Sequence, residues 1–353
     1  MGDLDEIFDM HKPEFKAFRL VTPDGFLDSE RYLTKEGRIN LNLVYSLYAD
    51  GHSIQMVKLN KIWNPINKMC FNFRKITSHN FNVNMYLTPK NSVAFTPHTD
   101  THDVFILQIA GSKKWEIYDS PYETPLIEHK ALSPINPNKL SGKKDITLNA
   151  GDLLYIPKGV PHNAYTTPDE SSLHLTVGMY PVQWLDLVRE FMLSEASNRV
   201  ELRKALPFGY LRNQSSLPEI KEKLQSIILD TKVNGTFEAV IDKLENDLRI
   251  IQTPIADGHF SSLDKIHDIK LSSKLIKRAN ISCRVVDIPE DPNFCRLIFN
   301  GNSIRGPQKI KNAFEFLAKI EGAFTPDSIP LENKKHRLTL CKKFIRGGLL
   351  SIS

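Results

Sequence analysis

The chain has 353 residues, of which 41% are apolar and 25% are charged, and these fractions are typical of a folded globular protein. They exclude a disordered or collagen-like chain, and no apolar run approaches the roughly 20 residues that a membrane-spanning helix needs. The formal net charge of +5 is unevenly spread, because residues 267–353 contain 16 Lys and Arg against 8 Asp and Glu.

The N-terminal residues and the cysteines bear on the cellular compartment. Residues 1–6 are acidic and lack the basic segment and apolar core of a signal peptide. The four cysteines lie far apart without a Cys-x-x-Cys pair, so neither a zinc ribbon nor a disulfide framework is indicated. We therefore expect a cytoplasmic protein with reduced thiols and no membrane association.

Short strand patterns separated by Gly, Pro and Asn follow a helix that is expected over residues 63–73. Residues 81–87 alternate between apolar side chains and the polar Asn82, Asn84 and Tyr86, so we expect a strand with one polar face and then a loop over 88–92. Further strands are expected at residues 104–110, 115–118, 145–148, 153–156, 162–166 and 173–180. This series is typical of an antiparallel sandwich or barrel.

After Pro181 the pattern becomes helical and then mixed. Amphipathic helices are expected at residues 183–196, 220–229 and 237–251. They are too few for a core of their own, so they should pack on the barrel or on a second copy of the chain. Strand patterns at 281–286 and 295–299, followed by helices at 307–319 and 332–345, fit a winged-helix module. Its basic charge is explained either by a solvated surface or by an acidic partner such as nucleic acid.

Two short motifs predict a metal site. His98 and Asp100 are two residues apart on a predicted strand, so their side chains point to the same face. His162 opens a later strand, after turns at Gly151 and Gly159, and can supply a third ligand. Two His and one Asp on one face of an ion are the ligands of non-heme Fe(II) oxygenases. His102 shares the same parity and is either a rival ligand or a residue on the substrate side.

A lysine follows the turn at Gly111 and Ser112. If the strand turns back, the Lys113 ammonium enters the site and needs an anion, which the distal carboxylate of 2-oxoglutarate would supply. The alternative is that Lys113 and Lys114 are both exposed on a hairpin. Four further residues could assist the same cosubstrate or be structural: Asn84, Tyr86, His174 and Thr176.

With these motifs in view, the chain resembles the JmjC-type ribosomal oxygenases, the cupin-like 2-oxoglutarate hydroxylases of ribosomal proteins. The motifs that carry the resemblance are residues 84–89 (NMYLTP), 97–100 (PHTD), 103–108 (DVFILQ), 111–115 (GSKKW) and 151–162 (GDLLYIPKGVPH). Residues 184–187 and 202–207 also resemble the linker of this family.

The resemblance implies a mainly β plus α architecture in three domains. A double-stranded β-helix (jelly-roll or cupin) JmjC barrel would occupy residues 1–181, a helical dimerisation region residues 182–258, and a winged-helix domain residues 259–353. His98, Asp100 and His162 would bind Fe(II). Lys113 would pair with 2-oxoglutarate, assisted by three residues: Asn84, Tyr86 and Thr176.

The implied function is Fe(II)- and 2-oxoglutarate-dependent hydroxylation, using O₂, of an Arg or His side chain in a ribosomal or other protein or peptide. The protein is expected to be a homodimer, and nucleic acid could bind its basic C-terminal region but is not an expected partner. One alternative is a hydroxylase of precursor peptides of modified-peptide natural products. Another is a ligand-sensing cupin with a DNA-binding winged helix. The chain departs from the family in a shorter N-terminal lobe and at three residues: Thr99, His102 and Gly178.

Overall fold

A computed structural model describes residues 17–23, 25–120, 123–126, 135, 139–210, 216–231, 236–250, 257–288 and 290–353. The predicted absence of a signal peptide concerns residues 1–6, which lie outside this range. The chain separates into two compact units, one of Met1–Pro181 with Thr253–Ser353 and one of Val182–Gln252. In the described part of the chain, no helix is long and apolar enough to cross a membrane. The limits of the three predicted domains remain a prediction.

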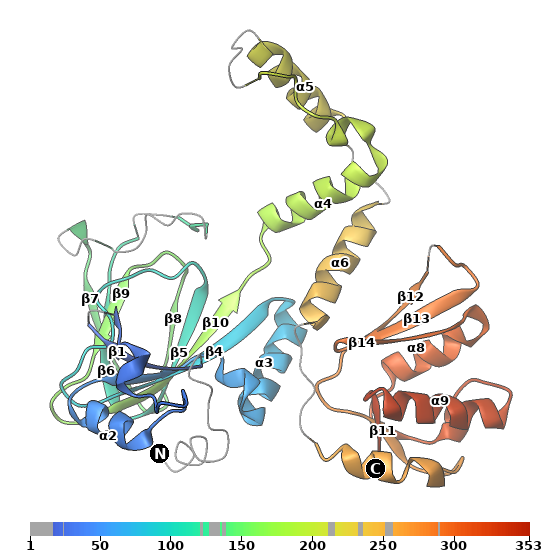
Figure 1. The fold of residues 1–353 in the computed structure, drawn as a ribbon, viewed down its shortest axis with the longest axis horizontal. Helices are drawn as coiled ribbons and strands as arrows, with labels where there is room; N and C mark the ends of the chain where they lie inside the picture. The colour runs from blue at the N-terminus through green and yellow to red at the C-terminus, as the bar shows by residue number, and fades with distance from the viewer. Residues whose placement is uncertain are drawn as a thin grey trace. The chain divides into compact units, whose positions relative to one another are not determined.

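The N-terminal part of the first unit is a barrel-like arrangement of two antiparallel sheets (Figure 1). The larger sheet has the strand order β2-β1-β3-β4-β10-β5-β8, and the smaller one has the order β7-β6-β9. The elements are β1 (Phe18–Thr22), β2 (Gly25–Phe26), α2 (Leu41–Ala49), β3 (Ser53–Met56), α3 (Asn64–Thr77), β4 (Asn80–Thr88), β5 (Asp103–Ala110), β6 (Ser112–Ile117), β7 (Lys144–Asn149), β8 (Leu153–Ile156), β9 (His162–Tyr165) and β10 (Ser172–Tyr180). The predicted series of short antiparallel strands is confirmed.

The two faces of the larger sheet have different roles. One face packs with α2 and α3 into the main hydrophobic core, to which β10 contributes Leu173, Leu175 and Val177. Because side chains alternate along a strand, the even-numbered residues of β10 face the smaller sheet. A second, smaller apolar cluster that includes Ile106 and Trp115 packs there. The space between the sheets is therefore partly apolar and partly lined by polar residues.

The chain passes from one sheet to the other at a single glycine. β5 belongs to the larger sheet and β6 to the smaller one, and Gly111 joins them with a φ of +64°. A Cβ atom at this position would lie 1.8 Å from the carbonyl oxygen of Ser171. Only glycine fits both the backbone conformation and the space. This corner decides which side chains of β6 face the interior.

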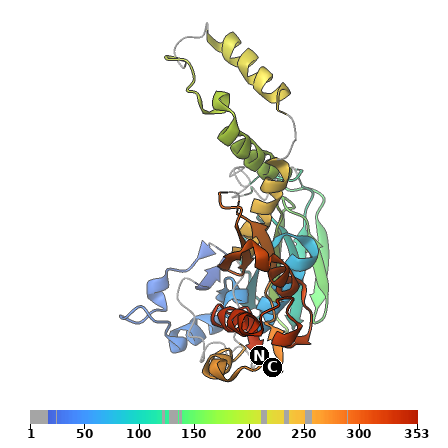
Figure 2. The same cartoon turned by 90° about the vertical axis from the view of Figure 1, so that its right-hand side faces the viewer.

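The second unit contains α4 (Trp184–Asn198), α5 (Leu217–Leu229) and α6 (Thr236–Ile250). α4 and α6 lie side by side in both views (Figures 1 and 2) and are joined by an ion pair between Lys243 and Glu190. The three predicted helices are confirmed as far as the structure describes them. Many of their apolar side chains are exposed, including Trp184 at 83% and Leu229 at 81%. These helices bury little of their own apolar surface.

The C-terminal part, from residue 257 onwards, has its own core. Two three-stranded antiparallel sheets, β12-β13-β14 and β15-β11-β16, accompany three helices. The elements are α7 (Phe260–Asp264), β11 (Leu275–Lys277), β12 (Cys283–Asp287), β13 (Phe294–Phe299), β14 (Asn302–Pro307), α8 (Lys311–Lys319), β15 (Ala323–Phe324), α9 (Lys334–Arg346) and β16 (Leu350–Ile352). Phe314 and Phe344 pack edge to face at its centre.

One prediction in this part was wrong. A helix was expected to begin at residue 307, whereas residues 302–307 form β14 and the helix begins at Lys311. The turn at Gly301, with a φ of +71°, returns the chain alongside β13, and the hairpin continues up to Pro307. A proline at that position ends the strand instead of starting the helix.

Candidate functional site

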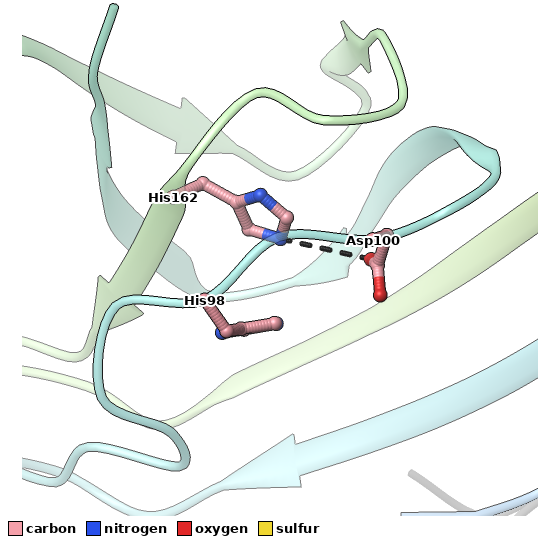
Figure 3. A group of neighbouring side chains, drawn as sticks. All are labelled: His98, Asp100 and His162. Atoms are coloured by element: carbon pink, nitrogen blue, oxygen red, sulfur yellow. Dashed lines mark ion pairs between the residues drawn. The ribbon is translucent and has the colours of Figure 1, made fainter. Parts of the chain in front are cut away.

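Backbone hydrogen bonds hold His98 directly against His162. The His98 amide donates to the His162 carbonyl oxygen at 3.1 Å, and the His162 amide donates to the His98 carbonyl oxygen at 2.9 Å. The two residues thus form a single antiparallel bridge, and their ring centroids lie 4.5 Å apart. A residue from the loop between β4 and β5 is therefore fixed against the first residue of β9 (Figure 3).

Asp100 completes a group of three possible metal ligands. One ligand atom from each of His98, Asp100 and His162 lies within 4.8 Å of the others. The His162 Nε2 is 3.8 Å from the Asp100 Oδ2, and the three side chains point into one space in Figure 3. The expected strand at 98–100 is not present, because β5 begins at Asp103. The bridge to His162 positions the pair instead.

The two histidines are held so that the same ring nitrogen remains available. The His98 Nδ1 is 3.0 Å from the Thr96 carbonyl oxygen, and the His162 Nδ1 is 3.0 Å from the Val160 carbonyl oxygen. A carbonyl partner requires the proton on Nδ1, so the Nε2 lone pairs are free to bind a metal. The pKa of His162 is lowered to about 4, mainly by burial and to a smaller extent by the neighbouring His98. His162 is therefore neutral at pH 7, as ligation requires.

A cavity between the sheets brings most of the predicted site residues together. Its lining includes His98, Asp100, His162, Lys113, Tyr86, Thr176 and His174. The Lys113 side chain is 2% exposed, whereas Lys114 is exposed, so the hairpin alternative is wrong for Lys113. The Lys113 Nζ donates to the Thr88 Oγ1 at 2.9 Å. Among the described residues no carboxylate pairs with it, and burial lowers its pKa to about 7.

The polar face of β4 and the inner face of β10 are paired residue by residue. Tyr86 is opposite His174 and Asn84 is opposite Thr176. The rings of Tyr86 and His174 stack at 5.0 Å, and burial raises the pKa of the Tyr86 phenol. Asn84 does not line the cavity, because its Oδ1 accepts a hydrogen bond from the Lys58 amide at 3.0 Å. The Asn84 side chain also hydrogen-bonds the Tyr86 phenol.

His102 does not belong to the three-ligand group. Its ring stacks on Tyr180 with centroids 4.4 Å apart and planes at 11°. Gly178 provides the space for this ring, because a Cβ atom there would lie 2.7 Å from the His102 Cδ2. Burial first, and then Asp100, raise the pKa of Tyr180. Two positions at which the chain departs from the family it resembles, His102 and Gly178, thus form one packed group beside the three possible metal ligands.

Three residues of the site were not identified from the sequence. Thr88, the partner of Lys113, was assigned to a loop but is the last residue of β4. Its parity with Tyr86 could have revealed it. Trp115 packs edge-on against His174 at 5.5 Å, and Phe95 packs against His98 at 5.5 Å. Aromatic residues are frequent in cores, so no sequence signal separates these two from ordinary core residues.

The arrangement combines two imidazole nitrogens and one carboxylate oxygen with a buried ammonium in the same cavity. The nitrogen and oxygen ligands fit a divalent ion such as Fe(II), and no thiolate belongs to the three-ligand group to favour zinc. The ammonium needs a negatively charged group for stable burial. The cavity can therefore hold a metal ion together with an anionic ligand.

Comparison with protein families identifies the fold of this region. Residues 59–187, which contain the three ligands, the lysine and the cavity, match the family model described as the JmjC domain. The chain carries a JmjC domain. For these residues, the expected resemblance to the JmjC-type ribosomal oxygenases is confirmed at the level of the JmjC domain, together with the cupin-like fold of mixed β and α content.

Two relatives are similar to this chain over more than half of its length. The chain is 34% identical over 212 residues to the bifunctional lysine-specific demethylase and histidyl-hydroxylase NO66 of Drosophila sechellia, covering 58% of this chain and 32% of the relative. It is 31% identical over 261 residues to NO66 of Culex quinquefasciatus, covering 69% of this chain and 40% of the relative. The chain thus spans between a third and two fifths of the length of these relatives.

Solved structures extend the similarity over nearly the whole chain. The X-ray structure of E. coli YcfD has a TM-score of 0.52 at 18% identity, covering 95% of this chain and 86% of that one. A YcfD structure described as a ribosomal oxygenase in complex with cobalt and 2-oxoglutarate has a TM-score of 0.50 at 17% identity, covering 98% and 89%. At this identity the similarity concerns the fold.

Proposed function

We propose that the protein is an Fe(II)- and 2-oxoglutarate-dependent oxygenase that hydroxylates an amino-acid side chain of a protein or peptide. The observation that carries the proposal is that one cavity contains both the three-ligand group and the buried, carboxylate-free ammonium of Lys113. A metal-binding cupin without cosubstrate chemistry has no need for the ammonium. The histidyl-hydroxylase name of the relatives and the 2-oxoglutarate in the YcfD structure agree with this choice.

His98, Asp100 and His162 would hold the metal, since their ligand atoms converge and both imidazoles present Nε2. Lys113 would hold the distal carboxylate of 2-oxoglutarate, with Thr176 and Tyr86 on the neighbouring walls. Asn84 would act through Tyr86, because its side chain lies outside the cavity lining. The cobalt of the YcfD structure suggests the kind of ion, a divalent transition metal.

The bound Fe(II) and cosubstrate would supply O₂-dependent oxidation of a substrate C–H bond, with release of succinate and CO₂. The protein's own residues would bind the metal and the cosubstrate and orient them. The backbone bridge between His98 and His162 holds these two metal-binding side chains in place before the metal or the cosubstrate binds. The apolar walls formed by Ile106 and Trp115 limit the access of water. Lys113 would neutralise the distal charge at the buried side of the cavity.

The substrate side chain is proposed to be His or Arg, with His favoured by the name of the NO66 relatives. A ribosomal protein is the proposed substrate, in line with the description of E. coli YcfD as a ribosomal oxygenase. The protein is proposed to act in the cytoplasm. A hydroxylase of precursor peptides and a DNA-binding sensor are the alternative functions, and no contact among the described residues favours either of them specifically.

The second unit is proposed to pair two copies of the chain. Its helices expose large apolar side chains such as Trp184, Leu193 and Leu229, and surfaces of this kind are usually covered by a partner. The C-terminal part is proposed to be the predicted winged-helix domain. It uses part of its basic charge internally, in ion pairs such as Arg337 with Asp327 and Lys311 with Asp287.

Succinate release tests the proposal. The purified protein would be incubated with Fe(II), 2-oxoglutarate and either ribosomes or a lysate peptide pool, and the products would be searched by mass spectrometry for one added oxygen. We expect succinate and a modified His or Arg with the wild-type protein and neither product with His98→Ala. Full activity of His98→Ala would refute the metal assignment. Tight, salt-dependent duplex binding without 2-oxoglutarate turnover would favour the DNA-binding sensor.

A further inference from the structure

His174 is a buried histidine beside Lys113 in the cavity, and neither the family comparison nor the proposed ligand set gives it a role. Its side chain is 3% exposed, and it lines the cavity together with Lys113 and Thr176. It comes from the inner face of β10, two residues before Thr176. Its position alone is compatible with a core residue, so the contacts of its ring decide the question.

The ring is held rigidly by aromatic neighbours that do not satisfy its polar atoms. Tyr86 stacks on one face at 5.0 Å with planes at 11°, and the Trp115 ring meets it edge-on at 5.5 Å and 81°. The His174 Nδ1 is buried and has no hydrogen-bond partner among the described residues. A core histidine normally has such a partner, because an unpaired buried nitrogen is costly. A ligand in the cavity would supply it.

The charge state of His174 indicates which ligand fits. The pKa of His174 lies well below the usual value, mainly because the ring is buried and to a smaller extent because the Lys113 ammonium is nearby. The imidazole is therefore neutral and carries one N–H, beside a lysine that has no carboxylate partner among the described residues. A carboxylate has two oxygens. One can accept from the ammonium and the other from the imidazole.

We propose that His174 is a binding residue for the distal carboxylate of the cosubstrate, donating a ring N–H beside the Lys113 ammonium. This rests on the proposed 2-oxoglutarate dependence and adds a second donor to the single lysine. A rigid donor held between Tyr86 and Trp115 fixes the direction of the carboxylate, which a flexible lysine cannot do alone. Lys113 and His174 would then both bind the distal carboxylate of the five-carbon dicarboxylate.

The test compares two ligands that differ only in the distal carboxylate. Binding of 2-oxoglutarate and of 2-oxopentanoate, which keeps the keto acid and lacks the distal carboxylate, is measured by calorimetry with Mn(II) present. In His174→Phe, which keeps a planar ring, we expect 2-oxoglutarate to bind about ten- to a hundredfold more weakly, the range for loss of a hydrogen bond to a charged group. The affinity for 2-oxopentanoate should be unchanged.

His174→Gln, which retains a donor, should recover part of the affinity for 2-oxoglutarate, and His336→Phe on the exposed surface of α9 serves as the matched control. Equal losses for both ligands in His174→Phe would show a merely structural role and overturn the inference. Unchanged 2-oxoglutarate binding would overturn it as well. If the wild-type protein with Mn(II) binds no 2-oxoglutarate, the proposed function itself fails, which is a distinct result.

Discussion

Replacing Lys113 by Met should make the unliganded protein more stable while removing its affinity for 2-oxoglutarate. Burial lowers the pKa of Lys113 from 10.5 to about 7. Between these values the unfolded chain binds a proton that the folded chain does not, so the stability of the wild-type protein rises with pH over this window. At pH 7 the buried ammonium is therefore a net cost to folding.

The size of the cost follows from the pKa values. A difference of one unit corresponds to about 1.4 kcal/mol, so a shift from 10.5 to about 7 costs about 5 kcal/mol when the folded lysine is fully protonated. At pH 7 about half of the folded lysine is neutral, and the cost is on the order of 4 kcal/mol. Met has a similar length and no charge. It loses the hydrogen bond to the Thr88 Oγ1, which contributes about 1 kcal/mol. The net gain in unfolding free energy for Lys113→Met is then about 3 kcal/mol, or roughly 6–12 °C in melting temperature.

Thermal unfolding at pH 7 and pH 10, with and without Mn(II) and 2-oxoglutarate, measures the effect. Lys113→Met should melt above the wild-type protein at pH 7 without ligand, and the gap should shrink at pH 10, where the wild-type lysine is neutral. The ligand should stabilise the wild-type protein only. Lys114→Met, next in sequence but exposed, should change the unfolding free energy by less than about 0.5 kcal/mol. A lower melting temperature for Lys113→Met at pH 7 would refute the reasoning.

Three further predictions concern other features. The dissociation constant of 2-oxoglutarate should rise about tenfold for each pH unit above 7, because the Lys113 ammonium is lost there, and a flat calorimetric profile would contradict this. Gly178→Ser should displace His102 from its stack on Tyr180, seen as a changed ring environment by NMR, with unchanged metal affinity. Trp184→Glu should convert the proposed dimer to a monomer in light scattering, and a wild-type protein that is already monomeric would refute the pairing.

The three candidate metal ligands could be predicted from the sequence because their signals are local. His98 and Asp100 lie two residues apart, and His162 follows two glycine turns that place it at the start of a strand. For Lys113 the sequence left two orientations open, one pointing into the site and one exposed on a hairpin. Its direction depends on the Gly111 corner, which passes the chain to the other sheet and turns Lys113 inwards and Lys114 outwards.

The remaining features depend on contacts between distant segments. His98 lies in a loop, and its backbone is positioned by the bridge to His162, a residue 64 positions later, which no strand pattern within one segment could have predicted. The contact between Lys113 and Thr88 joins two sheets across 25 residues of chain. The ring of His174, on β10, meets Tyr86 of β4 and Trp115 of β6. No periodicity within one segment contains this information.

Strand β10 has a consequence for how the protein can vary. Its odd-numbered residues, Leu173, Leu175 and Val177, belong to the main core, while the even-numbered His174 and Thr176 line the cavity between the sheets. A saturation mutagenesis experiment along this strand should therefore alternate in phenotype. Substitutions at odd positions should reduce protein abundance, whereas those at His174 and Thr176 should leave the abundance unchanged and reduce the turnover of 2-oxoglutarate. One strand thus keeps the selection for folding and the selection for chemistry on separate residues.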